Sequence, residues 1–105
     1  MPKFTLTEKA KSDLKDIARF TQKRWGREQR NKYLASLDNS FQRLVENPSI
    51  GKDCSEIKEG YQKFPTGRHV IYYRRSEKAP MQIVRVLHES MDVELQFSAN
   101  NTERH

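Results

Sequence analysis

Apolar residues are spaced three or four positions apart in two segments of the first half of the chain. The first segment has its apolar positions at Ala10, Leu14, Ile17, Ala18 and Trp25, with Thr21 filling the gap. This stripe predicts an amphipathic helix. We expect Thr7 to cap its N-terminus and Gly26 to end it with a left-handed turn.

The second segment, residues 27–46, repeats the same spacing. Its apolar positions are Leu34, Leu37, Phe41, Leu44 and Val45. Pro48 follows directly and stops the helix. Because Gly26 alone separates the two segments, we expect their helices to form an antiparallel hairpin.

Runs of β-branched and aromatic residues predict the strands. Residues 3–6 form a short strand before the first helix. Residues 61–64 and 70–73 flank Pro65-Thr66-Gly67, so they predict a β-hairpin with its turn at these three residues. Residues 81–88 form a further strand with apolar residues on both faces. We expect the helices to cover one of these faces and something else, such as a partner, to cover the other.

Together these elements predict an α+β fold. Sequential strands joined by short turns pair antiparallel, so the helical hairpin would pack on one face of a small twisted antiparallel sheet. Residues 48–60 are predicted to be a loop, 76–80 a turn, 93–97 one helical turn, and the residues from 100 onward a polar tail. The 105 residues fit a single domain, 1–105.

Charge adds a suggestion about partners. The chain has 20 Lys and Arg against 14 Asp and Glu, a formal charge of +6. This excess either keeps a small protein soluble or indicates an acidic partner such as nucleic acid, a nucleoprotein machine or an acidic protein. The first residues contain no apolar core of signal-peptide length, and no apolar run approaches the ~20 residues that span a bilayer. We therefore expect a cytoplasmic protein without membrane contacts.

Candidate chemistry is sparse. Cys54 is the only cysteine and cannot form an internal disulfide. Glycine-rich nucleotide motifs, a nucleophile elbow and zinc-ligand spacing are missing, and His88 with Asp92 would supply only two metal ligands. We expect neither a cofactor nor a metal. His69 and His88 are compatible with partly buried polar side chains at strand ends.

The β-hairpin allows a second interpretation. RNA cleavage without a metal needs cations and an acid or base, and Arg68, His69, Arg74 and Arg85 are of these types. Tyrosines at 61, 72 and 73 alternate with this charge, as in nucleic-acid contacts or in ordinary sheet packing.

Three motifs give the chain a resemblance to a known family. They are ENPSIGK at residues 46–52, FPTGRHVIYYR at 64–74 and RVLHESMD at 85–92. In this order they resemble the ParE toxins of the RelE/ParE superfamily, and the similarity covers a core of about residues 4–97. It implies a helical hairpin on an antiparallel sheet and the toxin of a type II toxin–antitoxin system, associated with plasmid stabilisation. It also implies a ParD-like antitoxin, a DNA-binding dimer whose C-terminal segment wraps and blocks the toxin.

The superfamily has two activities. Characterised ParE toxins poison DNA gyrase and block replication, whereas RelE-like relatives cut mRNA inside the ribosome. The nuclease branch has lysines in the first hairpin strand, an arginine after the turn, and a C-terminal arginine and tyrosine. At these positions the chain has Gln62, Phe64, His69 and the segment 89–91, and no tyrosine follows Tyr73. Most of the nuclease set is therefore missing, although the two histidines could substitute.

We therefore expect a gyrase poison that acts by binding, has no catalytic residues and meets DNA indirectly through gyrase. A ribosome-dependent mRNA endoribonuclease is the alternative, and a structural or DNA-binding module is a third possibility. The resemblance assigns no antitoxin-binding residues. The residues expected to bind the target are Arg68, His69, Arg74, Arg85, His88, Met91 and Asp92.

Overall fold

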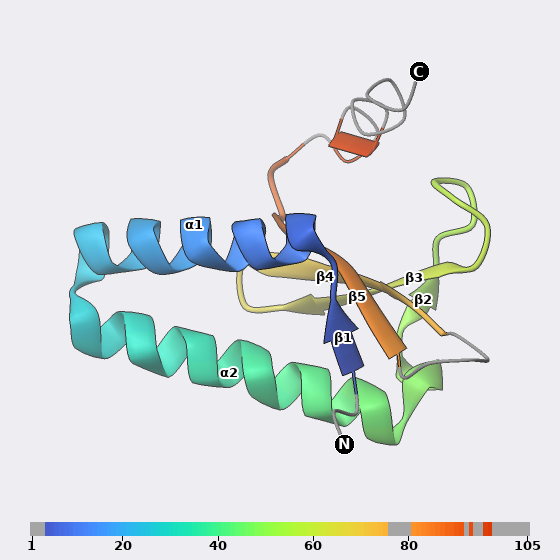
Figure 1. Ribbon diagram of the computed structural model, residues 1–105, viewed down its shortest axis with the longest axis horizontal. Coiled ribbons are helices and arrows are strands. Elements are labelled where there is room, and N and C mark those ends of the chain that lie inside the picture. Colours follow the sequence, from blue (N-terminus) through green and yellow to red (C-terminus); the bar gives the residue numbers. More distant parts are fainter. Residues whose placement is uncertain (1–3, 76–80, 92, 94–95, 98–105) are drawn as a thin grey trace.

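The computed structural model describes residues 4–75, 81–91, 93 and 96–97. Two helices, α1 (Glu8–Trp25) and α2 (Arg27–Glu46), form an antiparallel hairpin that packs on a sheet (Figure 1). The other elements are β1 (Phe4–Leu6), the 3-10 helix η1 (Pro48–Ile50), β2 (Lys52–Asp53), β3 (Tyr61–Thr66), β4 (His69–Arg74) and β5 (Met81–His88). The predicted α+β class is confirmed.

The helix boundaries follow local signals. Thr7 Oγ1 accepts a hydrogen bond from the Ala10 N–H at 3.0 Å, which caps α1 as predicted. Gly26 ends α1 with a φ of +98° and is also the residue before α2. Asn47 and Pro48 end α2. Both predicted helices are therefore present with the expected bounds.

The sheet is mixed, which differs from the wholly antiparallel sheet that we predicted. In the described residues its strand order is β1-β5-β4-β3-β2. The β2–β3, β3–β4 and β4–β5 pairs are antiparallel, whereas β1 pairs parallel with β5. The rule that short turns give antiparallel pairs holds only for consecutive strands, and most of the chain lies between β1 and β5.

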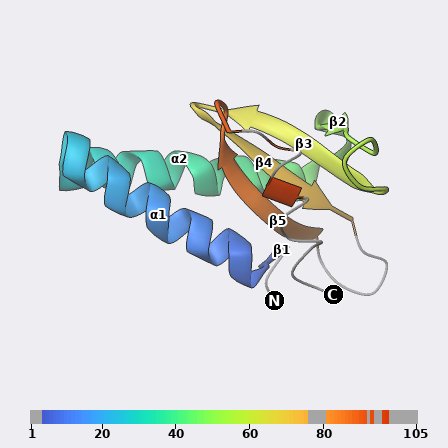
Figure 2. The same ribbon diagram turned by 90° about the horizontal axis from the view of Figure 1, so that it is seen from above.

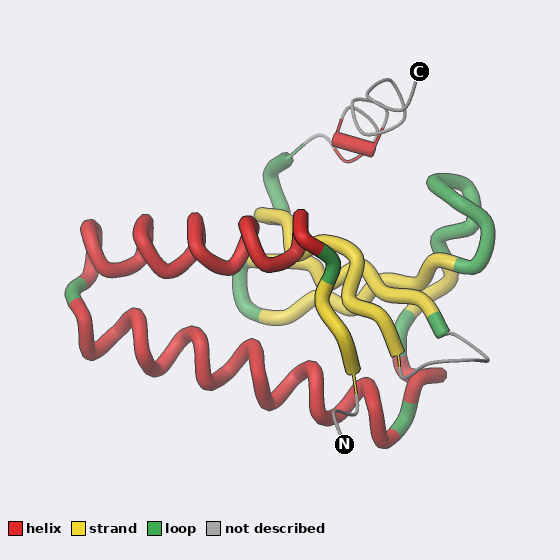
Figure 3. Tube along the Cα trace, viewed as in Figure 1, coloured by secondary structure: helices red, strands yellow, loops and turns green. Residues whose placement is uncertain are grey.

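The turn of the β3–β4 hairpin lies later than predicted. Thr66 pairs with His69, so the turn consists of Gly67 and Arg68, and Pro65 belongs to β3. The proline is tolerated because β2 pairs no further along β3 than Lys63, so its missing N–H breaks no ladder bond on that side. Figure 3 shows this turn beside the helical hairpin.

The main core lies between the helices and the sheet. Its most buried members include Leu37, Phe41 and Leu44 of α2 and Ile71 and Ile83 of the sheet. Trp25 was predicted to belong to this core, but the structure leaves its side chain 64% exposed. The helices extend beyond the end of the sheet, so the last turn of α1 has no strand to pack on (Figure 1).

A second, smaller cluster covers the opposite face of the sheet. It contains Cys54, Tyr61, Tyr72, Val84, Leu87 and Phe97. The Phe97 ring lies 5.8 Å from that of Tyr61 and 5.4 Å from that of Tyr72, and the red segment that carries it lies over the sheet in Figure 2. Both faces of β5 are buried as predicted, but the chain itself covers the face for which we expected a partner.

Four smaller predictions have mixed outcomes. The predicted loop 48–60 contains η1 and the two-residue strand β2. Residues 93, 96 and 97 are helical, in agreement with the predicted helical turn. The predicted turn at 76–80 and the tail from residue 100 lie outside the described residues.

Candidate functional site

A groove with a volume of about 750 Å³ lies between the protruding helical hairpin and the end of the sheet where β4 begins and β5 ends. Its apolar lining includes three large side chains that are well exposed to solvent. Phe20 is 63% exposed, Trp25 is 64% exposed and Met91 is 45% exposed. Exposed apolar groups gathered in one concave place mark an interaction site more often than scattered ones do.

The polar side of the groove is built by two paired strand ends. His69 begins β4 and His88 ends β5, and the two are direct partners in the ladder. Their side chains therefore lie on the same face of the sheet, with the rings 5.3 Å apart and nearly perpendicular. Together with Arg68 in the adjacent turn, they bring an ionisable pair and a cation to the groove wall.

Tyr33 of α2 holds this wall against the helices. Its hydroxyl accepts a hydrogen bond from the Arg68 backbone N–H at 3.1 Å and lies 2.5 Å from His69 Nδ1. We assign the hydroxyl proton to the bond with Nδ1, which leaves the proton of neutral His69 on Nε2. Burial, and next the charge of His88, lower the pKa of His69, so it is neutral at pH 7. Burial also raises the pKa of Tyr33.

His88 has its own local partner. Its Nδ1 accepts the Ser90 backbone N–H at 3.1 Å and lies 2.7 Å from Ser90 Oγ. The Glu89 N–H donates to the Arg68 carbonyl at 2.9 Å, which ties the residues after β5 to the β3–β4 turn. In each histidine Nδ1 is occupied within the chain, which leaves Nε2 as the nitrogen that can meet a ligand.

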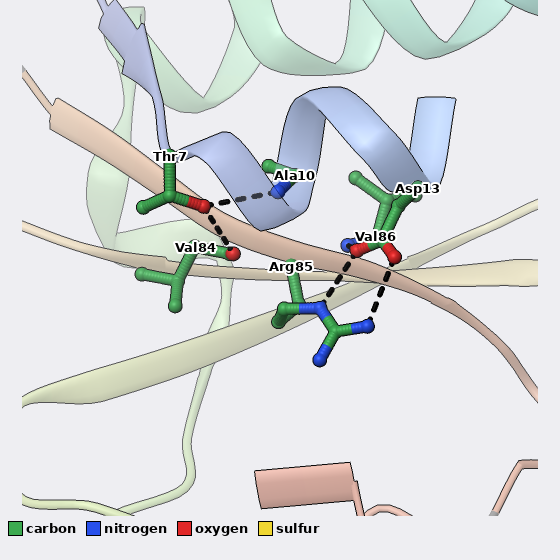
Figure 4. Close-up of polar contacts among 6 residues, drawn as sticks. All are labelled: Thr7, Ala10, Asp13, Val84, Arg85 and Val86. Atoms are coloured by element: carbon green, nitrogen blue, oxygen red, sulfur yellow. Dashed lines mark hydrogen bonds and ion pairs between the residues drawn. The ribbon is translucent and has the colours of Figure 1, made fainter. Parts of the chain in front are cut away.

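Arg85 was expected to bind the target, but the structure buries it in an ion pair. Its guanidinium donates to both carboxylate oxygens of Asp13 in α1, at 2.8 and 2.9 Å (Figure 4). Asp13 Oδ2 also accepts the Val86 N–H at 3.0 Å. Arg85 therefore fastens α1 to β5 and is not available to a partner.

Asp13 was missed in the sequence, although a signal for it exists. It lies between Ala10 and Ile17 along the apolar stripe of α1, so a carboxylate at this position indicates a buried cationic partner.

Some of the other expected site residues lie together in the groove, and others do not. Arg68, His69, His88 and Met91 all line the groove. Arg74 lies at the opposite end of β4 from His69, where its Nε donates to Gln82 Oε1 at 2.8 Å. Asp92 lies outside the described residues.

The groove residues that sequence reasoning missed include three large aromatic side chains: Phe20, Trp25 and Tyr33. Trp25 was assigned to the core because it follows the apolar period of α1. Tyr33 precedes the first predicted core position of α2, and its role depends on a hydrogen bond to a residue 36 positions away.

Metal and thiol chemistry find no support in the described part of the chain. There, the structure contains no group of three or more His, Cys, Asp or Glu side chains that could hold a metal ion. Burial raises the pKa of the Cys54 thiol to about 11, as in an unreactive structural cysteine. Within the same residues, neither helix combines the length and apolarity that crossing a membrane requires.

Comparison with known proteins identifies the family. Residues 4–93 match the model of the ParE toxin of the type II toxin–antitoxin system parDE. Toxin ParE1 of Mycobacterium tuberculosis is 38% identical over 92 residues, covering 88% of this chain and 94% of the relative. Toxin ParE1 of Caulobacter vibrioides is 35% identical with the same coverage. Toxin ParE of Escherichia coli is 31% identical over 93 residues, covering 89% of this chain and 90% of the relative.

A solved structure supports the fold. A chain of the chromosomal ParDE TA system from P. aeruginosa aligns with a TM-score of 0.70 at 20% identity, covering 84% of this chain and 96% of that one. The family match and the curated relatives place the chain among the toxins of the RelE/ParE superfamily, and its fold agrees with this. This chain belongs to the ParE toxins of type II toxin–antitoxin systems, and the resemblance read from its motifs is confirmed.

Proposed function

We propose that this ParE toxin poisons DNA gyrase by binding it through the groove, and so blocks replication in the cytoplasm. The observation that carries the proposal is the exposure of Phe20, Trp25 and Met91 beside the cation Arg68. Aromatic and apolar anchors next to an arginine are typical of the few residues that dominate protein–protein affinity. Such a surface favours action by binding.

A ParD-like antitoxin is the second proposed partner. Family membership supports it, because the matched family is the toxin of the type II toxin–antitoxin system parDE. Neutralisation requires only that the bound antitoxin exclude gyrase from the groove, either by covering it or by blocking access to it.

The experiment is a supercoiling and cleavage assay with purified toxin, gyrase and plasmid DNA. We expect linear cleaved DNA to accumulate and the antitoxin to reverse the effect. Met91→Asp should abolish cleavage because it places a charge among the apolar anchors. Asn39→Asp makes the same charge change at an exposed position of α2 that does not line the groove, and should leave cleavage intact. Unchanged cleavage with Met91→Asp would reject the groove as the gyrase site.

A ribosome-dependent endoribonuclease is the second candidate, and one specific observation favours it. His69, His88, Tyr33 and Arg68 meet in one groove, which supplies two acid or base groups and a cation. If gyrase is unaffected, the toxin should be added to programmed ribosomes and the mRNA examined. Cut mRNA that disappears with His88→Gln would establish this activity in place of gyrase poisoning.

A further inference from the structure

The end of the helical hairpin carries nearly all of the excess positive charge of the chain. Residues 19–32, here called the hairpin tip, contain six cationic side chains and one carboxylate, a formal excess of five out of a total of +6. The tip comprises the last turns of α1 and the first turns of α2, and it projects away from the sheet (Figure 1). The cations are Arg19, Lys23, Arg24, Arg27, Arg30 and Lys32.

The central cations of the tip are not neutralised within the described part of the chain. Arg19 pairs with Asp16 at 3.8 Å, and Lys32 pairs with Glu28 at 3.7 Å. Lys23, Arg24 and Arg27 are exposed, and none of the three forms an ion pair with a carboxylate of a described residue. They therefore face solvent as free positive charges.

Exposed aromatic rings accompany these charges. Trp25 lies between Arg24 and Arg27 in sequence, and the Arg24 guanidinium lies 5.6 Å above its ring. Phe20, five residues earlier on α1, is similarly exposed. Free cations beside solvent-facing aromatic rings are the two components of surfaces that bind single-stranded nucleic acid, where the cations follow the backbone and the rings stack on bases.

The position of the charge favours nucleic acid over an acidic peptide. A docked peptide helix needs an apolar groove. The groove has Arg68 as its only cation among the residues that line it, and Asp16 offsets that charge. Lys23, Arg24 and Arg27 belong to the tip and are not among the residues that line the groove. A projecting cationic surface suits an extended polyanion that lies along it.

We propose that the hairpin tip binds single-stranded DNA directly. Lys23, Arg24 and Arg27 contact the phosphate backbone, and an unpaired base stacks on Trp25. The choice of DNA over RNA rests on the proposed gyrase function, whereas the binding itself does not. Trp25 also lines the groove, so in a gyrase poison the enzyme held by the groove and the DNA held by the tip would meet at its ring.

Trp25 provides a direct probe because it is the only tryptophan of the chain. Its fluorescence should be followed while the isolated toxin, without gyrase, is titrated with an oligonucleotide of ~15 bases, a length within the known range of site sizes. We expect quenching, with an affinity that falls as salt rises from ~50 to ~200 mM. Unchanged fluorescence across the titration would overturn the proposal.

A charge-matched pair of triple variants tests the location. Lys23→Gln with Arg24→Gln and Arg27→Gln removes three charges from the tip. The control, Lys15→Gln with Lys52→Gln and Arg75→Gln, removes three exposed charges elsewhere. We expect the tip variant to bind at least ~10-fold more weakly and to lower the slope of log K against log salt by about 2, because each single-strand phosphate contact contributes ~0.7. Equal losses in both variants would mean diffuse attraction and would overturn the proposal.

Titrations with other polyanions test which kind of ligand the tip binds. Single-stranded RNA that binds ~10-fold more tightly than DNA would reject the assignment to DNA, and polyglutamate that quenches Trp25 as strongly as DNA would assign the tip to an acidic protein. DNA binding by a toxin that leaves gyrase unaffected would support the tip and reject only the gyrase target. If a toxin that binds no DNA still poisons gyrase, the DNA-binding role of the tip is rejected and the gyrase target stands.

Discussion

At the scale of single residues, Asp13 links the first helix to the last described strand. It binds the Arg85 guanidinium through both oxygens and also accepts the Val86 N–H, so it joins α1 to β5 at three points. Both side chains of the ion pair are almost buried, at 11% and 12% exposure. Breaking a buried pair costs far more than losing a surface pair, because the remaining charge keeps no partner.

Asp13→Ala should therefore lower the free energy of unfolding by about 3 kcal/mol. Asp16→Ala is the matched control, because it removes a carboxylate three residues later whose pair with Arg19 is exposed and long. The control should change stability by no more than ~0.5 kcal/mol. Urea unfolding of both variants measures the difference, and similar losses would contradict the role assigned to Asp13.

Arg68 differs from Arg85 because only its backbone has a structural role. Its N–H donates to Tyr33 and its carbonyl accepts from Glu89, while its side chain is exposed in the groove. Arg68→Ala should leave stability unchanged and weaken gyrase poisoning by about 2 kcal/mol, or ~30-fold, as expected of an anchoring arginine. Arg75→Ala, an exposed arginine outside the groove, serves as the control in the same cleavage assay.

His69 should make stability depend on pH. Burial and the nearby charge of His88 lower its pKa in the folded state below the value of ~6.5 in the unfolded chain. As the pH falls below ~6.5 the unfolded chain takes up a proton that the folded protein does not, so stability decreases with acid down to the folded pKa. His69→Asn keeps an acceptor for Tyr33 but does not titrate.

The measurement is urea unfolding at pH 7.5 and at pH 5.5. Wild-type protein should lose more stability between these values than the His69→Asn variant, and titrating groups that do not interact with His69 cancel in the difference. Equal losses would mean that the pKa of His69 is the same in the folded and the unfolded protein.

At the scale of elements, the β3–β4 turn packs closely against α2. Gly67 has a φ of +59°, and a Cβ added there would lie 2.9 Å from the Tyr33 hydroxyl. Only glycine therefore lets the turn approach Tyr33 closely enough for the hydrogen bonds to Arg68 and His69.

Gly67→Ala should destabilise the protein more than Gly60→Ala does. Both glycines have positive φ, so both substitutions strain the backbone by ~1 kcal/mol or more. A Cβ at Gly60 meets nothing within 4 Å, whereas the one at Gly67 must also displace Tyr33. Chemical denaturation of the two variants compares the costs, and equal losses would show that the contact with Tyr33 adds nothing.

Elements set by local signals were predictable from the sequence, and those set by distant contacts were not. Thr7, Gly26 and Pro48 fix the helix ends within a few residues of themselves, so the helical hairpin was predicted correctly. The parallel β1–β5 pair and the Asp13–Arg85 bond join residues more than 70 positions apart, for which no local pattern exists. Strand β2 has only two residues, too few to show a period.

The candidate site was predicted only in part, because local patterns indicate some of its residues and distant contacts decide the others. Arg68, His69, His88 and Met91 come from two strand ends that antiparallel pairing brings together. Trp25 follows the helical period as a core residue would, and Phe20 was not singled out in the sequence. They are exposed because α1 extends beyond the sheet. The periodicity of one helix does not show how far the sheet beneath it reaches.

At the scale of the whole molecule, folding and target binding use separate parts of the hairpin. The half that covers the sheet contributes Leu37, Phe41 and Leu44 to the core, while the projecting half presents Phe20 and Trp25 to solvent. Stability should therefore depend on the first set of residues and toxicity on the second.

The double variant Phe20→Ser with Trp25→Ser tests this separation. Because both side chains are mostly exposed already, the free energy of unfolding should change by less than ~1 kcal/mol. Gyrase poisoning should disappear, because the groove loses two of its three large exposed anchors. Leu37→Ala is the opposite control: it opens a cavity under the helices and should cost about 3 kcal/mol, while any folded fraction keeps an intact groove. A stable double variant that still poisons gyrase would mean that the projecting end of the hairpin serves only DNA or the antitoxin, and that gyrase binds elsewhere.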